Sequence, residues 1–88
     1  MSFSPHVWSQ LKGLTAGPLM VALERDDWEL DNTRGSIHTY IKKIGNQNHR
    51  VQVHFHGRNA GWGPSLLKKM LSEIGWTEQD MKQLGLIN

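Results

Sequence analysis

The chain has 88 residues and a formal net charge of +2, which is only weakly suggestive of an anionic partner. A chain of this length is expected to form one small domain. It has no cysteine, which excludes a disulfide framework, thiol catalysis and cysteine-ligated zinc. Its apolar runs are too short for a membrane span and its first residues do not resemble a secretory signal, so we expect a cytoplasmic protein.

Two helices are predicted before the first strand. The first follows Ser4 as N-cap, has Pro5 at its first position and ends at Gly13. The second begins near Pro18. Its apolar residues follow the spacing i, i+3, i+4, i+7 of one helix face: Ala16, Leu19, Met20 and Leu23.

Residues 28–56 alternate with a period of two, which predicts three antiparallel strands. The strands are expected over 28–30, 36–44 and 49–56, separated by the turn sequences "DNTRG" and "GNQN". On the second and third strands, one alternating set is largely apolar and is expected to face the core: Ile37, Thr39, Ile41, Val51, Val53 and Phe55.

Helical spacing resumes after the glycine-rich connector "GRNAGWG". One helix is predicted to end at Gly75, and a shorter one begins with a capping signature at Thr77 and Asp80 and ends at Gly85. The whole order is helix, three strands, helix, with short helices added at both ends. It predicts an α+β fold with a three-stranded antiparallel sheet and helices on one face.

The expected parity of the strands brings the histidines together on the open face. If both apolar sets face the core, His38 lies opposite His54 or His56, and Glu29 lies opposite His38. The open face would then carry mainly polar side chains, with Arg34 at the turn: Glu29, His38, Tyr40, Lys42, Arg50, Gln52, His54 and His56.

Three interpretations of such a face remain open. Imidazoles and cations together suit RNA cleavage through attack of a 2′-hydroxyl, and an aromatic ring could stack on a base. The H-x-H spacing of His54 and His56, with His38 on the next strand, also fits a three-histidine zinc site. The third interpretation is a solvated sheet face without a function of its own.

Four short motifs in order resemble a known family. The stretches "LMVALERDDWELDNTRGSIHTYIKK", "VQVHFHG" and "GPSLLKKMLSEIGWTEQD" are similar to the HicA-type (YcfA-like) toxins of bacterial toxin–antitoxin pairs, from about Leu14 to Ile87. Hallmarks of that family are a G-W or G-F element after the first helix, G-S-x-H or G-S-H on the second strand, V-x-V-P-x-H on the third, and a G-[TP]-L-type helix. Here "DDW", "GSIH", "VQVHFH" and "GPSLLKKMLSEIG" stand at those places.

The resemblance implies a fold and an activity. It implies a double-stranded-RNA-binding-domain-like αβββα fold, an mRNA endoribonuclease that needs no metal ion, and a HicB-type antitoxin that covers the active face. The family's catalytic histidine maps to His38 and its strand-three histidine to His56, with Gly35 and Ser36 as the turn. Many members have histidine directly after G-S, where this chain has Ile37. The expected parity sends Ile37 to the core, so we favour His38.

We therefore predict a single HicA-like domain over 1–88, with an N-terminal extension at 1–13 and a core at about 14–87. It would be a cytoplasmic endoribonuclease without metal or cofactor, monomeric alone, with mRNA and a HicB-type antitoxin as partners. The alternative is a non-catalytic RNA-binding or protein-binding module of the same fold. The predicted catalytic residues are His38, Glu29 and His56. The predicted RNA-binding residues are Arg34, Gly35, Ser36, Tyr40, Lys42, Arg50 and His54.

Overall fold

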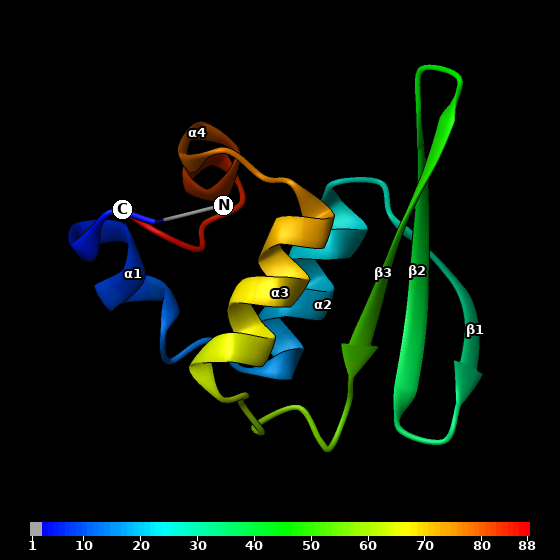
Figure 1. Cartoon of the computed structure of the whole chain (residues 1–88), viewed down its shortest axis with the longest axis horizontal. Helices are drawn as coiled ribbons and strands as arrows, with labels where there is room; N and C mark the ends of the chain where they lie inside the picture. The colour runs from blue at the N-terminus through cyan, green and yellow to red at the C-terminus, as the bar shows by residue number, and fades with distance from the viewer. Residues whose placement is uncertain (1–2) are drawn as a thin grey trace.

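A computed structural model describes residues 3–88, so Met1 and Ser2 of the predicted extension lie outside the described residues. The predicted order of four helices around three strands is confirmed (Figure 1). The elements are α1 Pro5–Leu11, α2 Ala16–Arg25, β1 Glu29–Arg34, β2 Ile37–Ile44, β3 Gln47–His54, α3 Pro64–Ile74 and α4 Glu78–Gln83.

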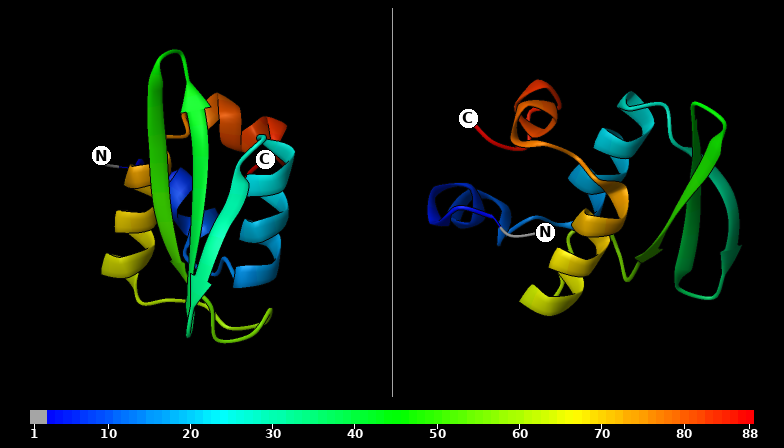
Figure 2. Two further views of the ribbon diagram at one scale, coloured as in Figure 1. Left: turned by 90° about the vertical axis from the view of Figure 1, so that its right-hand side faces the viewer. Right: turned by 45° about the horizontal axis from the view of Figure 1, so that its top comes forward.

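The elements form layers, with the sheet on one side and all helices on the other. The sheet has the antiparallel order β1-β2-β3, and α2 and α3 lie side by side against one of its faces (Figures 1 and 2). The helices α1 and α4 lie beyond α2 and α3, away from the sheet, and the tip of the β2–β3 hairpin rises past the helix ends. The predicted α+β arrangement is therefore confirmed, and no helix of residues 3–88 covers the other face of the sheet.

The register of β2 and β3 differs from the predicted one. The strands are joined by Gly45 and Asn46 alone, so Ile44 lies opposite Gln47 and Ile37 lies opposite His54. Gly45 has a φ of 63°, which favours glycine in a two-residue hairpin turn. The predicted pairing of His38 with His54 or His56 implied a loop of five or three residues, so the expected parity was wrong by one position. Each side chain of β2 consequently lies on the opposite face from the one expected.

The core forms between the helices and the inner face of the sheet. Tyr40 from the central strand is 2% exposed and packs among Val51 and Val53 of β3 and residues of α2 and α3. Val7 and Leu11 of α1 also belong to this core, although the motifs of the sequence do not reach them. The predicted extension is thus tied into the domain by buried apolar side chains.

Asp26 at the end of α2 connects this helix to β2 and to the segment between α3 and α4. Its Oδ2 accepts hydrogen bonds from the indole N–H of Trp76 at 2.7 Å and of Trp28 at 3.1 Å, and lies 3.2 Å from Nζ of Lys42 on β2. Burial alone raises the pKa of this carboxyl. The hydrogen bonds from Trp76, Lys42 and Trp28, with the charge of Lys42, outweigh that effect and hold the pKa below its ordinary value.

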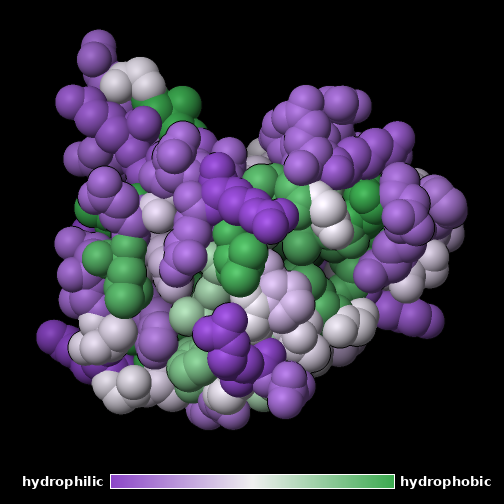
Figure 3. Space-filling view, turned by 180° about the vertical axis from the view of Figure 1, so that it is seen from behind, coloured by the Kyte–Doolittle hydropathy of each residue, from purple (hydrophilic) through white to green (hydrophobic). Residues whose placement is uncertain are grey.

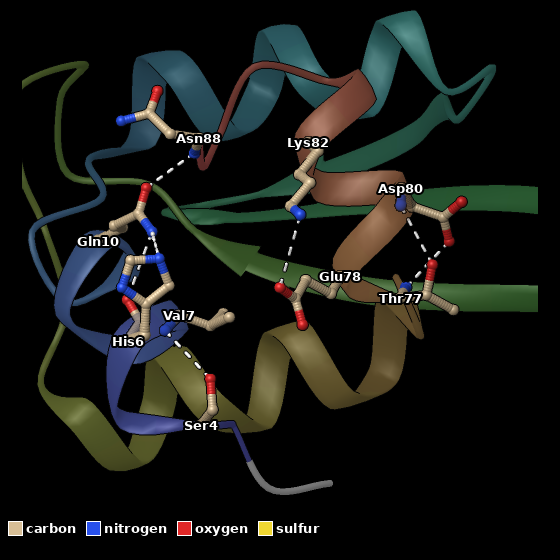
Figure 4. Close-up of polar contacts among 9 residues, drawn as sticks. All are labelled: Ser4, His6, Val7, Gln10, Thr77, Glu78, Asp80, Lys82 and Asn88. Carbon is tan, nitrogen blue, oxygen red and sulfur yellow. Dashed lines mark hydrogen bonds and ion pairs between the residues drawn. The ribbon is translucent and has the colours of Figure 1, made fainter.

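The helix ends follow the predicted capping chemistry with one correction. The Ser4 side chain accepts from the backbone N–H of Val7, and Thr77 and Asp80 form a reciprocal capping box (Figure 4). The helix α2 starts at Ala16 instead of Pro18, because carbonyls of the 57–63 connector accept from its first two backbone N–H groups.

The two ends of the described chain also meet. The backbone N–H of Asn88 donates to Oε1 of Gln10 on α1 at 2.7 Å (Figure 4). Among residues 3–88, no helix has the length and apolar character needed to cross a membrane.

Candidate functional site on the open face of the sheet

The open face carries three rows of side chains, each row running across the three strands. Residues directly opposite one another in adjacent strands point to the same face, and neighbouring strands lie about 4.8 Å apart. We call these nine residues the open-face grid: Arg34–Ile37–His54, Asn32–Thr39–Gln52 and Glu29–Ile41–Arg50.

The grid has an apolar middle and a polar border. Ile37 and Ile41 from the central strand are half-buried, and Thr39 between them is only 5% exposed because long side chains flank it on both sides. Six grid residues line a shallow hollow of about 250 Å³: Asn32, Arg34, Ile37, Thr39, Arg50 and Gln52. The hollow is bordered by amide, hydroxyl and guanidinium groups, which are the groups that bind phosphates and the edges of bases.

Two arginines give the grid its positive charge. Arg34 and Arg50 are both exposed, and within the described chain neither forms an ion pair with a carboxylate. They lie at opposite corners of the grid, one on β1 and one on β3. Glu29 occupies a third corner and is its one acidic residue.

His54 is the imidazole of the grid. It ends β3, lies opposite Ile37 and shares a row with Arg34. Its carbonyl oxygen accepts a hydrogen bond of 2.7 Å from the indole N–H of Trp62, which fixes the backbone at this position. The side chain is half-buried, so it combines a fixed backbone with access from the open face.

His38 does not lie on this face, and the predicted histidine cluster is therefore wrong. It lies opposite Thr33 and Val53, on the side of the sheet that faces the helices. Its ring packs against Phe55 with centroids 4.8 Å apart, and its Nδ1 is buried without a hydrogen-bond partner. Because His38 contacts Phe55 and is partly buried, it lies at the edge of the core.

Four other predicted site residues lie elsewhere than expected. Glu29 lies opposite Ile41 on the open face, whereas His38 lies on the helix side, so Glu29 cannot orient the His38 imidazole. Tyr40 is in the core, and its burial raises the pKa of its hydroxyl, with a further contribution from the charge of Glu24. Lys42 points to the helix side, where it pairs with Asp26. His56 lies exposed beyond the end of β3.

The turn between β1 and β2 keeps its predicted place, as do Arg50 and His54 on the open face of β3. Arg34 pairs with Ile37, so Gly35 and Ser36 form the two-residue connection. Gly35 has a φ of 59°, and the Ser36 carbonyl accepts from the backbone N–H of Phe55 at 2.7 Å. This turn fixes the corner of the grid where Arg34 and Ile37 stand.

The register also bears on a metal site. His38 and His54 are directed to opposite faces of the sheet, which separates two of the three predicted ligands. Within residues 3–88, no group of three or more histidine, aspartate or glutamate side chains is placed to hold a metal ion.

Five grid residues were absent from the predicted catalytic and RNA-binding residues: Asn32, Ile37, Thr39, Ile41 and Gln52. One signal in the sequence could have placed Ile37, Thr39 and Ile41 on the open face. Gly45 followed by Asn46, flanked by alternating residues on both sides, is typical of a two-residue hairpin turn. That turn length sets the observed register of β2 and β3. Comparison with known proteins gives no match to a family model, to a curated protein or to a solved structure, so the grid is interpreted from its residues and their geometry.

Proposed function

We propose that this chain binds single-stranded RNA on the open-face grid and cleaves it as a HicA-like, metal-independent endoribonuclease. The observation that carries the proposal is the grid itself, in which Arg34, Arg50 and His54 surround an uncovered hollow. Exposed guanidinium groups bind phosphates, and an imidazole can transfer protons near neutral pH. In this proposal His54 takes the role that the sequence assigned to His38.

The proposed reaction uses the row Arg34–Ile37–His54. A neutral imidazole of His54 accepts the proton of a ribose 2′-hydroxyl, and the 2′-oxygen attacks the adjacent phosphorus. The bond between phosphorus and the 5′-oxygen breaks, and that oxygen takes up a proton from the imidazolium or from water. The products are a 2′,3′-cyclic phosphate and a 5′-hydroxyl end. Arg34 stabilises the additional negative charge on the phosphorane.

The geometry of this row suits a single nucleotide. With two strand spacings of about 4.8 Å, the Cα atoms of Arg34 and His54 lie about 10 Å apart across Ile37. Both side chains are long enough to approach a phosphate held above Ile37. The apolar side chain of Ile37 offers a surface for the sugar or base without competing for the phosphate.

Local features of the chain support the family resemblance. The G-W element of the family is "DW" here, and Asp27 adopts a φ of 66°, the left-handed conformation in which glycine is usual. The backbone N–H of Trp28 donates to the carbonyl of Leu23, which completes the helix ending. On the proposal the fold is of the double-stranded-RNA-binding-domain type, the protein acts in the cytoplasm as a monomer on mRNA, and a HicB-type antitoxin covers the grid.

Incubation of the purified chain with a labelled single-stranded RNA in excess chelator tests this function. We expect shorter fragments with cyclic-phosphate ends, formed without added metal. A double-stranded RNA of the same sequence serves as the comparison and should be cut more slowly, because its 2′-hydroxyl groups are held away from in-line attack. RNA that stays intact, at protein concentrations that saturate binding, would contradict the cleavage step.

One observation favours a second function, a non-catalytic module that binds RNA or a protein partner. Ile37 stands directly after Gly35 and Ser36 on the open face, at the place where many members of the resembled family have histidine. His54 is then the one imidazole among the nine grid residues. A module of this kind would bind RNA with an affinity that falls as salt rises, and would leave the RNA intact in the same assay.

A further inference from the structure

A second surface lies away from the open face of the sheet, between α2 and the segment that follows α4. Pro18, Val21 and Ala22 of α2 form one side, and Leu84, Gly85 and Leu86 form the other. We call it the α2 groove, and its volume is about 420 Å³. Seen from behind, hydrophobic residues gather in a hollow on this side of the molecule, with strongly hydrophilic groups beside them (Figure 3).

We propose that the α2 groove binds an acidic segment of a partner protein, with aliphatic side chains in the groove and a carboxylate at each end. This surface is separate from the open-face grid, and the proposal does not depend on RNA cleavage. The argument rests on the apolar lining, on two arginines and on their spacing.

The groove is apolar and open to solvent. Val21 is 37% exposed, which makes it one of three large hydrophobic side chains exposed in the described part of the chain. Leu84 and Leu86 are half-buried and pack against the core while also lining the groove. Aliphatic side chains from a partner would remove this apolar area from water, which favours binding.

Arg25 and Arg58 mark the two ends of the groove. Arg25 stands in the last turn of α2, and Arg58 comes from the connector that crosses the first turn. Both are exposed, and neither forms an ion pair with a carboxylate of residues 3–88. The lining contains no aspartate or glutamate, so the charge of the groove is entirely positive.

The position of Arg58 is fixed by its contact with Gly17. The backbone N–H of Gly17 donates to the Arg58 carbonyl at 2.9 Å. A Cβ atom at Gly17 would lie 3.3 Å from that oxygen and 3.4 Å from the Arg58 Cβ, so a larger residue would push the connector outward. The glycine therefore lets Arg58 lie directly against the helix at one end of the groove.

The spacing of the arginines defines the occupant. Eight residues of helix separate Gly17, where Arg58 packs, from Arg25, which corresponds to about 12 Å at 1.5 Å per residue. An extended peptide spans about 13 Å in four residues. Two carboxylates four positions apart, with aliphatic residues between them, therefore match both arginines at once.

The lining favours a peptide over RNA. Single-stranded RNA is usually held by stacking of its bases on aromatic or imidazole rings. The open-face grid has the imidazole of His54, whereas the α2 groove has neither kind of ring. Pro18, Val21, Leu84 and Leu86 complement aliphatic side chains instead. Arginine paired with carboxylate adds directional hydrogen bonds at both ends.

The test titrates the whole chain with the capped pentapeptide Glu-Leu-Val-Leu-Glu and follows the chemical shifts of the chain by NMR. We expect shifts at Val21, Leu84 and Leu86 and no shifts on the open-face grid. The double variant Arg25→Gln with Arg58→Gln should weaken peptide binding by about tenfold, because it removes two exposed ion pairs. The variant Lys43→Gln with Lys69→Gln removes the same charge elsewhere and should bind as the wild type does.

Further arms separate charge from apolar contact. The peptide Gln-Leu-Val-Leu-Gln should bind the wild type about as weakly as Glu-Leu-Val-Leu-Glu binds the arginine double variant. The peptide Glu-Ser-Thr-Ser-Glu should not bind. The arginine variant should keep its RNA cleavage unchanged. Equal peptide affinity of wild type and arginine variant, shifts confined to the grid, or shifts of the groove with a short oligouridylate in place of the peptide would each overturn the proposal.

Discussion

Replacement of His54 by alanine is expected to reduce RNA cleavage by a factor of about 10² to 10⁴, the usual contribution of a general acid or base. The reason is its position, since it is the imidazole of the open-face grid and shares a row with Arg34. The measurement is the single-turnover rate with a labelled single-stranded RNA. RNA affinity should change little, because the phosphates are bound by arginine side chains.

The matched control is His38→Ala, one position away in the pairing but on the other face. This variant loses the contact with Phe55, so its free energy of unfolding should fall by about 1 kcal/mol. At a temperature where the variant is folded, its cleavage rate should change by less than threefold. The opposite ranking of the two variants, with cleavage lost in His38→Ala and kept in His54→Ala, would contradict the assignment of His54.

Replacement of Tyr40 by alanine is expected to lower the free energy of unfolding by about 3 to 5 kcal/mol, the range for loss of a large aromatic ring from a core. Tyr40 is 2% exposed and contributes to the core on the helix side of β2. The measurement is equilibrium unfolding by urea, with the slope of the transition compared between variants.

Gln52→Ala is the control for this experiment. Gln52 is exposed on the adjacent strand and lies on the open face opposite Thr39, so its removal should change stability by no more than about 0.5 kcal/mol. If Tyr40→Ala were as mild as Gln52→Ala, Tyr40 would have to point to solvent. The register described for β2 would then be incorrect.

Most of the fold could be predicted because its signals are local and repeated. The helical spacing of Leu67, Met70, Leu71 and Ile74 is confirmed as the buried face of α3, and Gly75 ends that helix with a φ of 81°. The alternation of 36–56 is confirmed as two strands of an antiparallel sheet. Each of these predictions rests on several residues that agree, so an error at one position does not alter the result.

The site could not be predicted in the same way, because it depends on the number of residues in one turn. Shortening the β2–β3 loop from three residues to two exchanges the faces of β2 relative to β3. The composition of β2 does not decide between the faces. One set holds Ile37 and Ile41, and the other holds Tyr40, whose ring is larger and is the one the core takes. The isoleucines remain half-buried on the open face.

Asp26 illustrates a second limit of the sequence. Its carboxylate joins α2 to β2 and to Trp76, fifty residues further along the chain. Nothing in the local sequence of Asp26 indicates these partners, since they are brought together only when the sheet packs on the helices. Long-range polar contacts of this kind are set by tertiary packing and are therefore found in the structure alone.

The central claim is that RNA meets the open-face grid, and backbone NMR of the His54→Ala chain during titration with a short oligouridylate tests it most directly. The variant keeps the RNA intact, so binding can be followed at equilibrium. We expect the largest shifts at Arg34, Thr39 and Gln52, with an affinity that falls as salt is raised. Shifts gathered instead around His38 and Phe55, or no shifts at any concentration, would contradict the claim.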